Sequence, residues 1–132
     1  MIMTQQEFEL FLQAKYPQLF GTDIALGASC YNDLVIDLGI ANNSDAKRML
    51  IRFLAKWRTS PEFILALCKA HCNGGKCLRL FGDEDLPSGM VLEAIMYAQK
   101  KQVLVGMENH PNYRFYLLSE KDLFKGKRLI NQ

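Results

Sequence analysis

The segment SPEFILALCKAHC, residues 60–72, is apolar on nearly every side of a helix, and it constrains the fold more than any other part of the sequence. Ser60 is a typical N-cap residue, Pro61 suits the first helical position, and the Asn-Gly-Gly that follows is a typical helix end. A helix without a polar face has to be surrounded by the rest of the chain. We therefore expect residues 61–72 to form a buried helix.

Caps and helical periodicity predict further helices around this one. Thr4 and Glu7 have the capping-box spacing, and Asn43 or Ser44 precedes the amphipathic segment DAKRMLIRFLAKW. The segment YNDLVIDL fits either a helix or a short strand, and its apolar spacing favours a helix. Ser88 is the expected cap of the last helix. The expected helices cover about residues 4–15, 31–38, 44–57 and 88–101.

Strand patterns are few and lie late in the chain. Residues 76–81, KCLRLF, alternate like a strand closed by Gly82, and the following DEDLP is expected to form a turn. Residues 102–118 predict a strand, a turn at 109–112 and a second strand, before a basic tail. At 132 residues the chain suits one domain. We predict a mixed α/β (α+β) fold, mostly helical with a small antiparallel sheet.

Neither a membrane span nor a secretory signal is visible. The longest apolar run, residues 63–68, is far shorter than the roughly 20 residues that a span requires. The amino-terminal MIMTQQEFELF lacks the charged, apolar and small-residue regions of a signal peptide. We therefore expect a cytoplasmic protein whose four cysteines are reduced thiols.

Positive charge is concentrated in the middle of the chain. Residues 45–79 hold eight Lys or Arg against two acids, whereas residues 1–44 and 80–99 are acidic. Arg48, Arg52 and Lys56 recur every fourth residue and so share one face of the predicted helix, with Lys47 beside them. Like charges at this spacing repel one another. The row is either a solvated helix face or a binding surface for a polyanion. The opposite apolar stripe consists of Leu50, Phe53, Leu54 and Trp57.

The segment CKAHCNGGKC raises the alternative of a zinc site. Its candidate ligands are Cys68, His71, Cys72 and Cys77, but three of them lie on one buried helix, which is awkward for a tetrahedral site. Core packing is the preferred reading, and we expect no metal or other cofactor. Phosphate-cradling glycine loops, HExxH and GxSxG motifs are absent from the sequence, so no catalytic residue is assigned. The aromatic residues expected in the core are Phe53, Trp57, Phe63 and Phe81.

Several strings, in this order, resemble the ProQ/FinO family of bacterial RNA-binding proteins over about residues 5–101. YPQLF is similar to a Phe-Pro-x-x-Phe segment of that family, and IALGASCYNDL to its Pro-Leu-x-x-Gly stretch that leads to Asp-Leu. CLRLFG is similar to the Arg-x-Asp-Leu-x-Gly strand of the family, with Cys77 in place of its arginine and Arg79 in place of its aspartate. Further matching positions are Leu50, Leu54, Trp57, Phe63, Ile64 and Ala98.

The resemblance implies an RNA chaperone in small-RNA-mediated post-transcriptional regulation. Its expected ligand is a terminator-type hairpin with a single-stranded 3′ tail: a basic face would hold the stem and a pocket would hold the 3′ end. Lys47 takes a lysine position of the family, Phe63 replaces the tyrosine of the 3′-end pocket, and Lys76 or Arg79 would supply the charge lost at Cys77. The predicted RNA-binding residues are Lys47, Arg48, Arg52, Lys56, Arg58, Phe63, Lys69, Lys76, Arg79 and Ser88.

Two other functions stay open at the level of sequence. One is a non-catalytic adaptor that binds another protein through the apolar helices and the predicted terminal hairpin, and the other is a small zinc-binding regulator. If the chain binds RNA, RNA is the expected partner. We expect no association with a membrane, and we expect the chain to be a monomer. Residues 1–132 are expected to form one RNA-binding domain whose core spans about residues 5–101, followed by residues 102–132.

Overall fold

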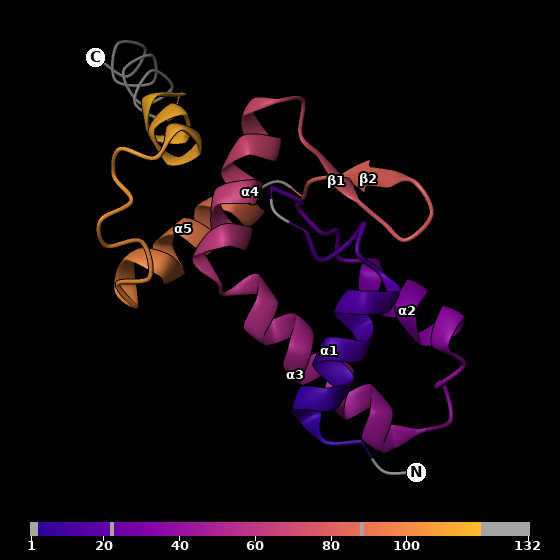
Figure 1. Cartoon of the computed structure of the whole chain (residues 1–132). Coiled ribbons are helices and arrows are strands. Elements are labelled where there is room, and N and C mark those ends of the chain that lie inside the picture. Colours follow the sequence, from indigo (N-terminus) through magenta and orange to yellow (C-terminus); the bar gives the residue numbers. More distant parts are fainter. Residues whose placement is uncertain (1–2, 22, 88, 120–132) are drawn as a thin grey trace.

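The computed structural model describes residues 3–21, 23–87 and 89–119. These residues form a mostly helical α+β fold with a small antiparallel sheet of two strands, which confirms the expected fold class. In Figure 1 the helices α1, α2 and α3 gather at one end of the molecule and α4 and α5 at the other, and the two-stranded sheet lies beside α2 and α4. The labelled helices are α1 (Gln5–Lys15), α2 (Cys30–Leu38), α3 (Ser44–Arg58), α4 (Pro61–Cys72) and α5 (Met90–Lys100).

The starts of α1, α3 and α4 follow the capping signals of the sequence. At α1, the Glu7 amide donates to Thr4 Oγ1 (3.1 Å) and the Thr4 amide donates to Glu7 Oε1 (3.2 Å), so the predicted capping box is confirmed. Asn43 accepts from the Ala46 amide (3.0 Å) at the start of α3. Ser60 accepts from the Phe63 amide (3.3 Å) at the start of α4. The N-cap of α5 is Gly89, so the predicted cap at Ser88 is wrong; Ser88 itself lies outside the described residues.

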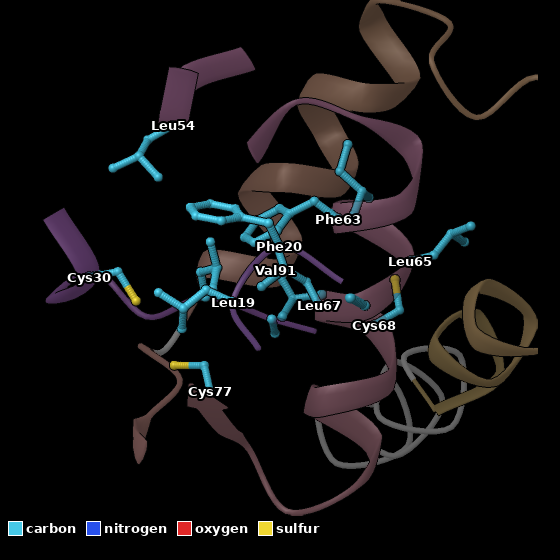
Figure 2. Close-up of a cluster of buried hydrophobic side chains, with 14 of the residues drawn as sticks. Leu19, Phe20, Cys30, Leu54, Phe63, Leu65, Leu67, Cys68, Cys77 and Val91 are labelled. Carbon is cyan, nitrogen blue, oxygen red and sulfur yellow. The ribbon is translucent and has the colours of Figure 1, made fainter. Parts of the chain in front are cut away.

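Helix α4 lies in the core, as its apolar surface predicts. All six residues from Phe63 to Cys68 are buried, and the helix packs against α3, α5 and the first strand. Figure 2 shows Phe63, Leu67 and Cys68 of α4 together with Val91 of α5 and Phe20 of the loop after α1. The core therefore joins elements from both ends of the molecule around one apolar helix.

The sheet differs from the prediction in where its strands lie. Strand β1 (Lys76–Leu78) is shorter than expected, and it pairs antiparallel with β2 (Asp83–Asp85), which was predicted to be a turn. The turn instead falls on residues 79–82, where the Arg79 amide donates to the Gly82 carbonyl (2.9 Å) and Gly82 has a φ of 98°. The acidic strand is tolerated because Asp83 and Asp85 are exposed. Phe81, expected in the core, lies in this turn and is 78% exposed.

The carboxyl-terminal part of the fold is helical, so the predicted strand–turn–strand at residues 102–118 is wrong. Residues 101–106 form turns and residues 111–119 form a helix that begins at Pro111. Tyr113 and Tyr116 are both buried, and their spacing of three places them on one side of a helix. The predicted basic tail falls on residues 120–132, outside the described residues.

A segment before α2 lies against the hairpin. Leu26 forms a parallel bridge with Leu78, the Leu78 amide donates to the Ala25 carbonyl (2.7 Å), and the Gly27 amide donates to the Leu78 carbonyl (2.9 Å). Glu84 of β2 then accepts from the amide (3.0 Å) and the hydroxyl (2.6 Å) of Ser29. These contacts fix the hairpin to the start of α2.

Gly27→Ala is expected to lower the free energy of unfolding by about 2 kcal/mol. A Cβ atom at Gly27 would lie 1.8 Å from Glu84 Oε1, so the carboxylate would have to leave its two hydrogen bonds to Ser29. Urea denaturation measures the change. In a Glu84→Ala background the same substitution should cost less than about 1 kcal/mol. Equal costs in both backgrounds would contradict this account.

Candidate nucleic-acid interface

The predicted cationic row forms an exposed face of α3. Arg48, Arg52 and Lys56 are all exposed, and we call these three residues the α3 ridge. The helix is held in this orientation because its opposite side packs into the core through Leu50, Phe53 and Leu54. Four residues of helix rise about 6 Å, so the three cations are spaced at regular steps along about 12 Å. Lys47, beside the ridge, is half-buried.

The three ridge cations differ in how far nearby carboxylates neutralise them. Arg48 Nη1 lies 3.9 Å from Asp45 Oδ1, and with side chains 64% and 87% exposed this pair is weak. Lys56 Nζ donates to Glu9 Oε1 (3.1 Å). Arg52 has no carboxylate partner among the residues that the structure describes. The ridge therefore keeps positive charge at its centre and at its Arg48 end.

Glu9 is a stable partner for Lys56 because it is itself held in place. Gln5 Nε2 donates to Glu9 Oε2 (3.0 Å) while Lys56 binds Oε1. Desolvation by burial raises the pKa of Glu9, but the hydrogen bonds from Gln5 and Lys56 outweigh it, so the pKa lies below its usual value. The carboxylate is thus charged at neutral pH.

The cations near the hairpin are all paired. Arg79 holds Asp33 of α2 with two hydrogen bonds, Nη2 to Oδ1 (2.9 Å) and Nε to Oδ2 (3.1 Å), and these bonds lower the pKa of Asp33. Lys76 pairs with Asp85 across the two strands, and Lys69 Nζ lies 3.5 Å from Asp23 Oδ2. Each of these cations would have to leave a carboxylate, or share it, to bind a phosphate.

Two of the predicted RNA-binding residues face inward. Phe63 is 3% exposed, so its side chain belongs to the core and offers no surface to a 3′ nucleotide. Arg58 is half-buried, and its Nη2 donates to the Gly27 carbonyl (2.8 Å), which ties the end of α3 to the segment before α2. Ser88 lies outside the described residues. The predicted residues that the structure describes therefore divide into the ridge with Lys47, the paired cations near the hairpin, and the inward residues Arg58 and Phe63.

The cysteine-rich segment is spread over different surroundings. Cys68 is buried in α4, Cys72 is exposed at the end of that helix, and Cys77 is buried on β1. All four cysteines of the chain are free thiols, and burial raises the pKa of Cys68 to about 12 and that of Cys30 to about 11. Within the described part of the chain, groups of three or more potential metal ligands are absent.

A pocket of about 400 Å³ adjoins the ridge at Lys56. Phe20, Phe53 and Trp57 contribute an aromatic cluster to it, with ring centroids 4.9 to 5.9 Å apart. Sequence reasoning missed this pocket, because its walls come from α1, the loop after it, α3 and the start of α4. The polar lining residues are Glu9, Gln13, Lys56, Ser60 and Glu62.

Comparison with known proteins returned no match among family models, curated proteins or solved structures. The similarity to the ProQ/FinO family thus remains a prediction from the strings of the sequence. Among the described residues, every helix is too short or too polar to cross a membrane.

Proposed function

We propose that the chain is an RNA-binding protein that holds structured RNA through phosphate contacts along the α3 ridge. The observation that carries the proposal is the regular row of three exposed cations, with Arg52 at its centre unneutralised by any described carboxylate. A row of like charges weakens an isolated helix, and a bound polyanion removes that cost.

A ridge of long cationic side chains is suited to binding the phosphates of duplex RNA and not to reading its base sequence. The deep groove of A-form RNA hides the base edges, so proteins recognise such duplexes mostly through shape and phosphate contacts. The ridge needs no base-specific side chains for this purpose. The finer proposal, supported by the resemblance, is a bacterial cytoplasmic RNA chaperone that binds terminator hairpins and assists pairing of small RNAs.

The test is binding of the wild-type chain to one terminator hairpin over a range of salt concentrations. If about four cations contact phosphates, log K should fall with log salt with a slope of about −3 to −4. Fluorescence anisotropy with labelled RNA measures it, and the same hairpin without its 3′ uridine tail is the matched control. Absence of salt-dependent binding would refute RNA binding, whereas equal binding of both hairpins would remove only the 3′-end recognition.

A protein-binding adaptor is the second candidate, and exposed apolar side chains favour it. Leu92, Met96 and Tyr97 of α5 are exposed, as are Phe115 and Leu118 of the helical residues 111–119. Exposed large apolar side chains are common at protein-binding surfaces. An adaptor would form a stable complex with an acidic protein and would show no affinity for the hairpin.

A further inference from the structure

The pocket beside the ridge has the size and lining of a small-molecule site. Its volume of about 400 Å³ lies within the range of about 300–1,000 Å³ that is usual for ligand pockets. Phe20 and Trp57 meet at 83°, so their rings form adjoining walls rather than a parallel stack. Trp57 is half-buried and presents its ring to the pocket, whereas Phe53 (2% exposed) and Phe20 (8% exposed) lie almost entirely beneath the pocket surface.

The charges of the pocket favour a cation. Two carboxylates, Glu9 and Glu62, line it against one ammonium group, that of Lys56. Glu9 already binds this ammonium at 3.1 Å, whereas Glu62 is exposed and has no ion-pair partner among the described residues. One negative charge thus remains to be balanced beside an aromatic surface.

The other polar groups of the pocket offer more acceptors than free donors. Ser60 Oγ donates to the Trp57 carbonyl (2.7 Å), and Gln13 Nε2 donates one of its two N–H groups to the Glu9 carbonyl (3.3 Å), so one N–H of Gln13 remains for a ligand. The amide oxygen of Gln13 and the carboxylate of Glu62 accept hydrogen bonds only. An anion such as a phosphate would be repelled by Glu9 and Glu62, and the one cation in the lining, Lys56, is already paired with Glu9.

We propose that this pocket binds an organic cation with an apolar body, of the aryl- or alkylammonium class. The ring of Trp57 contacts the apolar body and attracts the positive charge, and Glu62 pairs with the ammonium group at the margin. The site takes a ligand of opposite charge to RNA, although it shares Lys56 with the α3 ridge. It does not depend on the proposed RNA binding.

Trp57 is the single tryptophan of the chain and lies in the pocket, so its fluorescence reports binding directly. Benzylammonium, benzyl alcohol and benzoate share one ring and differ in charge. At fixed ionic strength we expect benzylammonium to change the emission saturably, with a dissociation constant about tenfold lower than that of benzyl alcohol, and benzoate to bind most weakly. Equal binding of benzylammonium and benzyl alcohol, stronger binding of benzoate, or no saturable response to benzylammonium would each overturn the proposal.

Two substitutions separate this site from the RNA-binding ridge. Glu62→Gln should weaken benzylammonium binding about threefold to fivefold, whereas Glu108→Gln, the same change at an exposed residue outside the pocket lining, should leave it unchanged. Lys56→Gln should strengthen benzylammonium binding about threefold, because it removes the competing cation. The same substitution should weaken the binding of hairpin RNA. Unchanged cation affinity in Glu62→Gln would refute the role of Glu62 whatever the RNA result.

Discussion

Simultaneous replacement of Arg48, Arg52 and Lys56 by alanine is expected to weaken binding to a hairpin RNA at least roughly tenfold. Each cation that contacts a phosphate displaces a counterion from the RNA, and the alanine side chains cannot do so. The slope of log K against log salt should therefore become shallower by about 3. The loss should be similar for hairpins of different sequence, since phosphate contacts carry no base information. Titration of labelled RNA at several salt concentrations measures both effects.

The fold should survive this triple change. The three side chains are exposed, alanine has the highest helix propensity, and the apolar face of α3 is untouched. The expected cost comes mainly from Glu9, which loses its bond from Lys56 but keeps the one from Gln5. Circular dichroism and thermal unfolding check that the variant is folded.

A matched control removes the same charge elsewhere. Lys100, Lys101 and Arg114 are exposed and lie outside α3, so replacing them by alanine lowers the net charge equally. If the ridge binds RNA, this control should keep most of the affinity. Equal losses in the two triple variants would indicate a general charge effect, and unchanged affinity of the ridge variant at matched salt would remove the ridge from the model.

The parts of the fold that were predicted correctly depend on local signals. The capping box at Thr4 and Glu7 and the Ser60-Pro61 start of α4 involve residues within one helical turn, so sequence spacing alone identifies them. The exposed row on α3 was predictable for the same reason, because residues four apart share a helix face.

The errors occurred where distant contacts decide the structure. Tyr113, Phe115 and the apolar residues around them alternate as in a strand, yet burial of Tyr113 and Tyr116 together requires a helix. The acidic segment 83–85 resembles a turn by composition, but it pairs with β1 because Gly82 reverses the chain just before it. Short segments of this kind fit two local structures, and packing selects one.

The site was only partly predictable because charge pairing is a property of the folded chain. Arg79 pairs with Asp33, which lies 46 residues earlier in the sequence, and Lys56 pairs with Glu9, which lies 47 residues earlier. A sequence shows the cations but not which of them are neutralised. The same applies to the aromatic pocket, whose walls are brought together by the packing of α1 against α3.

Phe63→Ala is expected to lower the free energy of unfolding by about 3–5 kcal/mol. The side chain is 3% exposed in the first turn of α4, and its removal leaves a cavity in the hydrophobic core. A domain of this size is stabilised by only about 5–15 kcal/mol, so this loss removes a large fraction of its stability. Urea denaturation at 25 °C measures the loss.

A milder substitution separates stability from RNA recognition. Phe63→Leu keeps an apolar side chain of similar volume and should cost less than about 1.5 kcal/mol. Because Phe63 faces the core and not the surface, we expect this folded variant to bind tailed and tailless hairpins as tightly as the wild-type chain does. Selective loss of the tailed hairpin in folded Phe63→Leu would show instead that Phe63 takes part in 3′-end binding, and that α4 must shift from the described packing when RNA binds.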